Sequence, residues 1–155
     1  SLKFINPKLK LKLMIVGKGD NFVNLKKFIY EKNLQKIVCL TGYLKNPYPA
    51  IKNSQIVILT SKFEGLPNIL LEAQYLKKYI ISTDCPTGPK EILLNGLAGD
   101  LIKIGDSKKL AYLINNYKKN RKNISKKINI GLKNFNRFDY KINCEQYLNF
   151  VLNNF

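Results

Sequence analysis

The fold of this chain is decided by residues 64–72, which read Glu64-Gly65-Leu66-Pro67-Asn68-Ile69-Leu70-Leu71-Glu72. Immediately before this stretch, residues 56–60 form a short apolar run that is typical of a buried strand. After Pro67 the apolar residues recur with helical spacing. The sequence therefore predicts a strand, a short loop that contains Glu64, and the start of a helix that carries Glu72.

The start of the predicted helix is suited to an anion. The first N–H groups of a helix lack partners and carry a partial positive charge. Pro67 fits the first helical position, where its missing N–H costs nothing, so the N–H groups of Asn68 and Ile69 are free to face a phosphate. Glu72 lies roughly 7.5 Å further along the axis, about the step from a diphosphate to its ribose, whose hydroxyls suit a carboxylate. Glu64 precedes the helix, on the other side of such a phosphate.

Strand-like runs alternate with helical patterns along most of the chain. The predicted strands cover residues 11–16, 37–40, 56–60, 79–83 and 99–104. Helices are predicted between and after them, with a cap at Asp20 or Asn21 for one and at Asp106 or Ser107 for another. This alternation predicts an α/β fold, a Rossmann-like parallel sheet with helices on both faces. We expect residues 1–155 to form a single domain.

The last part of the chain, residues 118–155, has a different composition. Residues 118–133 are rich in lysine, and apolar residues still recur every fourth position, which predicts a basic amphipathic helix with Ile124, Ile128 and Leu132 packed inward. Residues 140–155 are predicted to form a final helix with an aromatic stripe at Tyr147, Phe150 and Phe155.

Composition narrows the possible partners. The formal net charge is +17, from 27 basic and 10 acidic residues, which favours nucleotides, phospholipid surfaces or nucleic acid. The joint abundance of Lys, Ile and Asn is equally expected from an AT-rich genome.

No apolar run approaches the roughly 20 residues that span a membrane. The three cysteines are widely spaced, as expected for reduced thiols in a cytosolic protein. Histidine and an Asp-x-Asp motif are absent, so no metal site is expected.

The stretch from Glu64 to Glu72 resembles the Glu-x7-Glu motif of the retaining GT-B glycosyltransferases of the group 1 family. Further segments resemble this family in the same order along the chain: the strand and glycine turn at residues 13–19, the strand at residues 38–43, and the segment at residues 81–93. One Glu-x7-Glu pair is weak evidence, but the ordered set is specific. The resemblance covers about residues 11 to 115 and implies the C-terminal, donor-binding domain of such an enzyme.

The resemblance implies roles for particular residues. Glu64 would contact the donor sugar as the catalytic residue, and Glu72 would hold the ribose. The donor diphosphate would lie against the stretch between them, at Gly65, Leu66, Pro67, Asn68 and Ile69. The base would rest near Tyr43 and Leu44, and the turn at Gly17, Lys18 and Gly19 would approach donor or acceptor. Structural alternatives stay open: a carboxylate that favours the helix start for Glu64, a solvated residue for Glu72, and a tyrosine packed on Pro47 or Pro49 for Tyr43.

The chain departs from the family pattern at its start. The family's domain opens one strand earlier, and an Arg and a Lys after that strand clamp the diphosphate; neither has a counterpart here. We therefore expect a part of a longer enzyme, inactive alone and without a metal cofactor. That enzyme would move a hexose or N-acetylhexosamine from a nucleotide diphosphate sugar, with UDP as the expected nucleotide, to a glycan or lipid-linked acceptor. It resembles bacterial members that build surface polysaccharides in the cytoplasm, with peripheral membrane contact. The alternatives are a non-catalytic relic and a basic nucleic-acid-binding module.

Overall fold

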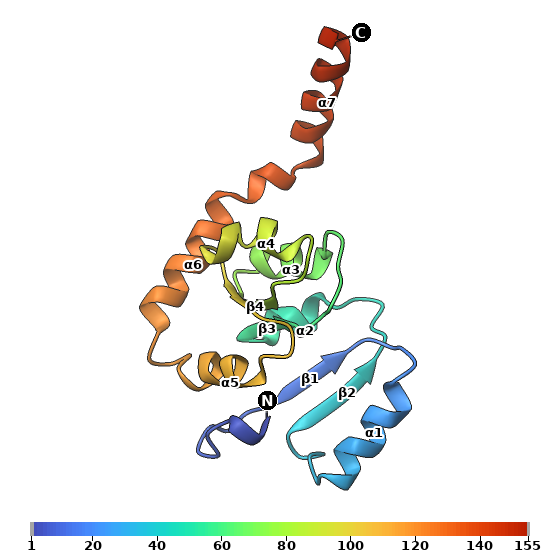
Figure 1. The fold of residues 1–155 in the computed structure, drawn as a ribbon, viewed down its shortest axis with the longest axis vertical. Helices are drawn as coiled ribbons and strands as arrows, with labels where there is room; N and C mark the ends of the chain where they lie inside the picture. Colours follow the sequence, from blue (N-terminus) through green and yellow to red (C-terminus); the bar gives the residue numbers. More distant parts are fainter. Residues whose placement is uncertain (1, 155) are drawn as a thin grey trace.

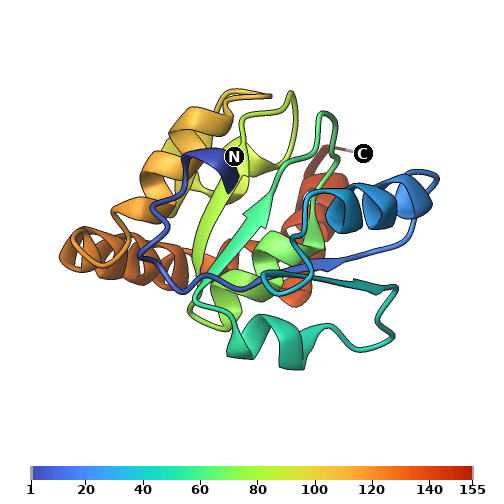
Figure 2. The ribbon, with the colours of Figure 1, turned by 90° about the horizontal axis from the view of Figure 1, so that it is seen from below.

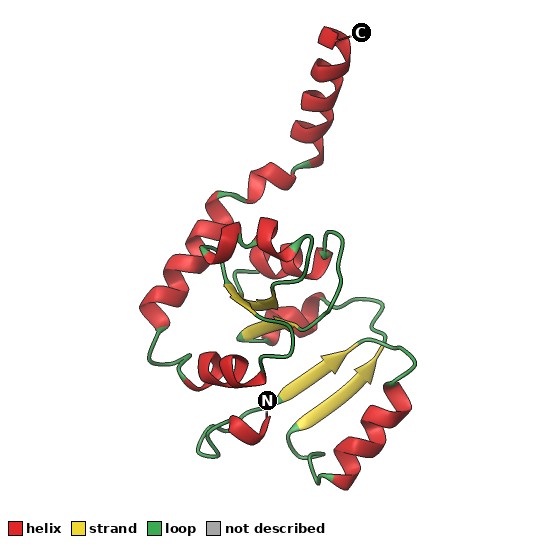
Figure 3. Cartoon of the chain, viewed as in Figure 1, coloured by secondary structure: helices red, strands yellow, loops and turns green. Residues whose placement is uncertain are grey.

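Strands and helices alternate along residues 2–154, which the computed structural model describes (Figures 1 and 3). The strands are β1 (Leu13–Val16), β2 (Val38–Gly42), β3 (Ile56–Leu59), β4 (Tyr79–Thr83) and β5 (Asp100–Ile102). The helices are α1 (Phe22–Glu31), α2 (Tyr48–Asn53), α3 (Asn68–Tyr75), α4 (Pro89–Ile92), α5 (Ser107–Asn115), α6 (Arg121–Lys133) and α7 (Tyr140–Asn154), with short 3₁₀ turns η1 (Leu2–Phe4), η2 (Leu94–Gly96) and η3 (Phe135–Phe138). Each strand predicted from the sequence is present.

The strands are parallel, as the alternation predicts, but hydrogen bonding divides them. In the described residues β1 pairs only with β2, while β4 pairs with both β3 and β5. A doubly wound sheet has the strand order 3-2-1-4-5-6. Without its first strand, such a sheet leaves a pair and a triplet, with open edges at β1 and β3, and this is the observed division. The strand order therefore fits a Rossmann-like sheet that lacks its usual first strand.

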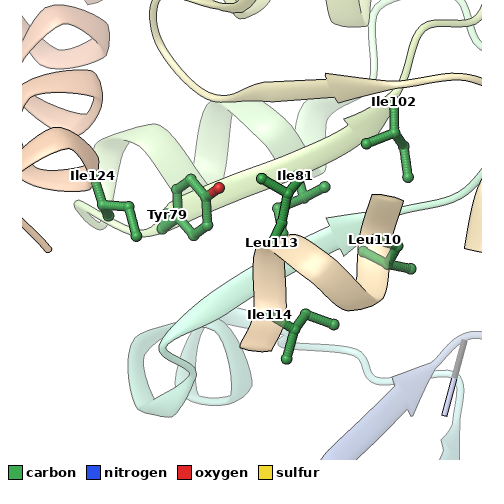
Figure 4. Packing of buried hydrophobic residues seen from close by; sticks show 7 residues of the cluster. All are labelled: Tyr79, Ile81, Ile102, Leu110, Leu113, Ile114 and Ile124. Carbon is green, nitrogen blue, oxygen red and sulfur yellow. The ribbon is translucent and has the colours of Figure 1, made fainter. Parts of the chain in front are cut away.

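The β3–β5 sheet is covered on both faces. All five residues of β4 are buried, as expected for a central strand of a doubly wound sheet. On one face Tyr79, Ile81 and Ile102 pack against α5 and α6 through the cluster of Figure 4, which also contains Leu110, Leu113, Ile114 and Ile124. On the other face Ile80 packs against α2, α3 and α4 in a cluster with Ile51, Leu70, Ala73, Ile92 and Leu93. Figure 2 shows α5 on one side of this sheet and α2 and α3 on the other.

The β1–β2 pair has much less cover. Its buried residues include Val38 on β2 and Ile29 on α1. On β1, by contrast, Met14 is 51% exposed and Val16 is 44% exposed. The two halves of the sheet therefore differ in how much apolar surface they remove from water.

A polar cluster of Tyr79, Asp100 and Lys127 holds α6 against the β3–β5 sheet. The Tyr79 hydroxyl donates a hydrogen bond of 2.6 Å to Asp100, and the Lys127 ammonium lies 3.2 Å from the other oxygen of the same carboxylate. Lys127 also donates to the carbonyls of Gly96 and Gly99. Burial, together with the hydrogen bond and the negative charge of Asp100, raises the pKa of Tyr79 far above its usual value. The amphipathic helix α6 is thus positioned by one lysine that points inward.

The C-terminal region agrees with its prediction in part. Helix α6 buries Ile124 and half-buries Ile128 and Leu132, but it begins at Arg121 rather than at residue 118. Helix α7 is present, and it extends away from the sheets in Figure 1. Its aromatic residues Tyr147 and Phe150 are exposed, while Phe155 lies outside the described residues. No helix in residues 2–154 is both long enough and apolar enough to span a bilayer.

Candidate functional site

The Glu64–Glu72 stretch forms a loop after β3 and then helix α3, as the sequence predicts. One detail of the prediction is wrong: Pro67 is not the first helical residue but the residue before it, with an extended ψ of 101°. The proline carbonyl accepts a 3.0 Å hydrogen bond from the Leu70 N–H. Helix α3 therefore begins at Asn68, one residue later than expected, because Pro67 keeps an extended backbone.

This helix start keeps the donors that the sequence predicts. The N–H groups of Asn68 and Ile69 are the first two of α3 and have no hydrogen-bond partner within residues 2–154. Asn68 is exposed and Ile69 is half-buried. Free N–H groups at the positive end of a helix are the elements from which proteins build phosphate sites.

The two carboxylates lie on either side of this helix start in the sequence. Glu64 is half-buried in the loop, and Glu72 is half-buried on the second turn of α3. The ion pairs of the described residues involve Lys27, Lys90 and Lys127, none of which contacts either glutamate. Both carboxylates therefore keep their acceptor capacity for hydroxyl groups of a ligand.

Glu72 lies in a surface groove of about 340 Å³. One side of α3 contributes Asn68, Leu71, Glu72 and Tyr75, and the groove is completed by Tyr48 of α2 and Phe135 of η3. Tyr48, Tyr75 and Phe135 are not among the site residues predicted from the sequence. A signal for Tyr75 was available, because positions 68, 72 and 75 share one face of a helix. Tyr48 and Phe135 reach the groove only through the tertiary fold.

The loop after β4 supports the Glu64 loop. The Thr87 hydroxyl donates to the Glu64 carbonyl oxygen, and the Thr83 hydroxyl donates to the Ser61 carbonyl at 2.6 Å. Gly88 has a φ of +84°, and a Cβ atom there would overlap the Gly65 carbonyl oxygen and lie 2.6 Å from Pro67 Cδ. Thr87 and Gly88 fix the path of the backbone that carries Glu64.

The remaining predicted residues lie on the loops after β1 and β2. The Gly17 N–H donates to the Gly42 carbonyl at 2.8 Å, so these two loops start side by side. Lys18 and Gly19 are exposed in the first loop. In the second loop Tyr43 is 75% exposed, which disfavours the alternative that its ring packs on a proline, and Leu44 is half-buried.

These predicted residues are not all gathered in one hollow. Glu64, Tyr43 and the Gly17–Gly19 turn do not line the groove around Glu72. A wider hollow of about 470 Å³ runs along α7 between Tyr140 and Leu148, but its lining holds no carboxylate or basic side chain. Within residues 2–154 no group of three or more His, Cys, Asp or Glu side chains is arranged to hold a metal ion. The groove at Glu72 therefore carries the clearest binding geometry.

The chain is similar in sequence to known proteins. The family described as "Glycosyl transferases group 1" matches residues 3–133. An uncharacterized glycosyltransferase of Methanocaldococcus jannaschii is 46% identical over 82 residues, which are 53% of this chain and 20% of that protein. The lipopolysaccharide 1,6-galactosyltransferase of Salmonella typhimurium is 35% identical over 97 residues, 60% of this chain and 27% of that enzyme. The chain thus spans about a quarter or less of the length of these two relatives.

The fold has a counterpart among solved structures. The crystal structure of Anabaena HepE in complex with UDP-glucose matches with a TM-score of 0.82 and 19% identity, over 99% of this chain and 43% of that one. At this identity the likeness concerns the fold. It extends over all of the elements described above, the C-terminal helices included.

Proposed function

Because this chain belongs to the group 1 family of glycosyl transferases, we propose that it is the donor-binding half of a retaining GT-B glycosyltransferase. The whole enzyme would move a hexose or an N-acetylhexosamine from a nucleotide diphosphate sugar to a glycan or lipid-linked acceptor. The observation that carries this proposal is the start of α3, where two free N–H groups stand between Glu64 and Glu72 in the sequence. The 155 residues are one donor-binding domain in this proposal, and they do not catalyse transfer alone.

The proposed placement of the donor follows from the helix start. The diphosphate accepts hydrogen bonds from the N–H groups of Asn68 and Ile69, at the positive end of α3. Glu72, one turn further along the helix, accepts hydrogen bonds from the ribose hydroxyls in the groove that it lines. Glu64 approaches the transferred sugar from the loop. The turn at Gly17–Gly19 and the loop at Tyr43 and Leu44 border the donor from the β1–β2 half.

The proposed chemistry depends on stabilising a leaving group. As the bond from sugar to diphosphate breaks, negative charge grows on the diphosphate. Fixed N–H dipoles aimed at such a charge stabilise the transition state without having to reorganise. We propose that the start of α3, together with basic groups of the whole enzyme, performs this task without a metal ion. Glu64 orients the donor sugar through its hydroxyl groups, and no residue of this chain is assigned as a nucleophile.

The comparisons support the choice of substrates. The Anabaena protein of the same fold was crystallised with UDP-glucose, which favours a UDP-sugar as the donor. The Salmonella relative acts on lipopolysaccharide, which favours an acceptor that is carried on a lipid and a role in bacterial polysaccharide biosynthesis. We place the enzyme in the cytoplasm, at the inner face of the cell membrane, and its described cysteines are free thiols, as expected there.

The nucleotide part of the proposal is tested by calorimetry with UDP. Glu72→Ala removes charged acceptors from the ribose hydroxyls and should weaken binding by about 1.5–3 kcal/mol. Glu91→Ala is the matched control, because Glu91 is an exposed carboxylate on α4 outside the groove. Equal UDP affinity of the wild type and Glu72→Ala would refute the ribose assignment.

The catalytic part is tested in the whole enzyme. Glu64→Gln should lower kcat far more than it weakens UDP binding, because Glu64 is placed at the sugar and not at the nucleotide. Parallel losses in both quantities would mean that Glu64 only shapes the loop. Sugar transfer by the 155 residues alone would contradict the proposal that this domain is inactive by itself.

A further inference from the structure

Helix α6 has two opposite faces. Ile124 and Lys127 point toward the sheet, where Ile124 contacts the cluster of Figure 4 and Lys127 reaches Asp100. Gly131, on the same side of the helix, lies against Gln74 of α3 and against Ala98. Lys122, Lys126 and Lys133 are all exposed. At 100° per residue these three positions fall within about 40° of one another, opposite the buried face. We call Lys122, Lys126 and Lys133 the α6 lysine face.

The charge of this face is not balanced by nearby acids. The sequence holds no aspartate or glutamate between Asp106 and Asp139. In the described residues no carboxylate pairs with any lysine of the face, whereas the adjacent Lys127 is paired with Asp100. Lys118, Lys119 and Arg121, which precede or open the helix, are exposed and add positive charge at the same end. The result is a local excess of cations on one side of the domain.

The chemistry of the face indicates the kind of partner. The α6 lysine face consists of lysines, which act as point charges. They lack the planar guanidinium group with which arginine makes paired hydrogen bonds to a base or to a single phosphate. Residues 118–134 contain no aromatic side chain, so bases have nothing to stack on. The three lysines extend over roughly 16 Å along a straight helix. A straight row of this length fits a flat, laterally mobile layer of negative charge.

We propose that the α6 lysine face binds the anionic headgroups of a phospholipid bilayer. The choice of a membrane rests on the proposed function, in which the acceptor is carried on a lipid. Helix α6 is held against the β3–β5 sheet by Lys127, so the face would hold the donor domain at the surface where that acceptor lies. In Figure 1, α6 lies on the opposite side of the molecule from α1 and from the loops after β1 and β2, which leaves these loops free while α6 contacts the bilayer.

Co-sedimentation with vesicles tests this proposal. The wild type should bind vesicles of phosphatidylcholine mixed with phosphatidylglycerol at low salt, should lose binding at high salt, and should not bind phosphatidylcholine alone. Each lysine near an anionic leaflet tightens binding about fivefold, so the triple variant Lys122→Glu, Lys126→Glu, Lys133→Glu should bind at least about a hundredfold more weakly. Thermal unfolding followed by circular dichroism verifies that the variant is folded.

A variant of equal net charge separates a local face from the overall charge. Lys26→Glu, Lys32→Glu, Lys36→Glu changes three exposed lysines in and after α1, a helix that lies on the far side of the domain from α6 in Figure 1. At about 0.1 M salt it should keep vesicle binding within about tenfold of the wild type, because charges beyond the Debye length of about 10 Å are then screened. Equal losses in the two variants would overturn the proposal and leave the net charge as the cause.

Two further results would overturn it. Binding to phosphatidylcholine alone that matches binding to the mixed vesicles would exclude an electrostatic face. Tighter binding to single-stranded poly-U RNA than to the mixed vesicles, lost in the α6 variant, would assign the face to nucleic acid instead. Calorimetry with UDP on the α6 variant distinguishes a failure of this proposal from a failure of the proposed function. The expected result is unchanged UDP affinity, since the face lies outside the groove at Glu72.

Discussion

The two halves of the sheet are built from similar strands but are covered very differently. In the β3–β5 half, β4 is buried along its whole length between clusters on both faces. In the β1–β2 half, Met14 and Val16 leave about half of their surface in water. The apolar strand sequences are alike, so the difference arises from what packs on them: α2 to α6 cover the β3–β5 half, whereas α1 is the helix that contacts β2.

This contrast extends to the two sets of loops that carry the predicted site residues. The loop with Glu64 and helix α3 stand on the covered half, where Thr83, Thr87 and Gly88 hold the backbone at fixed distances. The loops at Gly17–Gly19 and Tyr43 stand on the sparsely covered half. The groups proposed to meet the diphosphate, ribose and sugar thus lie on the covered half, where these contacts support the backbone. Catalytic geometry benefits from such support, because small displacements of a positioned group are costly in rate.

The largest effect is expected at Gly88, where the covered half and the site meet. An alanine at Gly88 would be strained by the positive φ, and its Cβ atom would also push the Gly65 carbonyl away. Together these two effects should lower the free energy of unfolding by roughly 4 kcal/mol. Urea denaturation measures this loss. UDP binding should also weaken, since the displaced loop leads into α3.

Gly105 provides a matched control for this substitution. It has nearly the same φ, +81°, but a Cβ atom there would meet no atom within 4 Å. Gly105→Ala should therefore cost only the backbone strain, about 1–2 kcal/mol. Similar losses for the two alanine variants would show that the contact between the two loops is not tightly packed.

The second prediction compares the two halves directly. Ile80 is fully buried on β4, and Ile80→Ala should lower the free energy of unfolding by about 3 kcal/mol because it removes apolar contacts and leaves a cavity. Met14→Ala on β1, which removes a half-exposed side chain, should cost less than about 1 kcal/mol. Comparable losses measured by urea denaturation would contradict the contrast between a covered and an open half.

The sequence alone was sufficient for the elements of the fold but not for the division of the sheet. Apolar runs such as residues 79–83 and the helical pattern after Pro67 identified strands and helices, because periodicity is a local property. The cap at Asp106 was also predictable, and its carboxylate accepts the Lys109 N–H at 2.8 Å. Which strands pair, and which apolar faces stay uncovered, depends on contacts between distant segments. No local pattern at Met14 distinguishes it from a core residue.

The site follows the same rule. The motif located Glu64, Glu72 and the free N–H groups, because their spacing along one loop and one helix is local. Tyr48 and Phe135 were missed, since they reach the groove at Glu72 from α2 and η3. Thr87 lies in the segment at residues 81–93 that resembles the family, but its hydrogen bond to the Glu64 carbonyl joins loops 23 residues apart in sequence. Such a partner can be identified only from the fold.

The third prediction concerns how α6 is fixed to the covered half. Lys127→Met should lower the free energy of unfolding by about 2 kcal/mol, because it leaves the largely buried carboxylate of Asp100 without its cation and frees the carbonyls of Gly96 and Gly99. Lys126→Met, at the next position but on the exposed face, should change it by no more than about 0.5 kcal/mol. Denaturant unfolding of both variants measures the two losses. Equal losses would contradict a stabilising role of Lys127 at the sheet.

The smallest effect, and the one most specific to the site, is expected at Thr87. Thr87→Val keeps the size and shape of the side chain but removes the hydroxyl that donates to the Glu64 carbonyl, so stability should fall by only about 1 kcal/mol. The local consequence should be larger than the global one: the Leu70 N–H, which donates to the Pro67 carbonyl at the end of this loop, should exchange faster, while exchange in β4 stays slow. Thr87→Ser retains a hydroxyl and should restore slow exchange at Leu70. If Thr87→Val leaves exchange at Leu70 unchanged, the loop is held by the close contact at Gly88 alone, and packing rather than hydrogen bonding fixes its path.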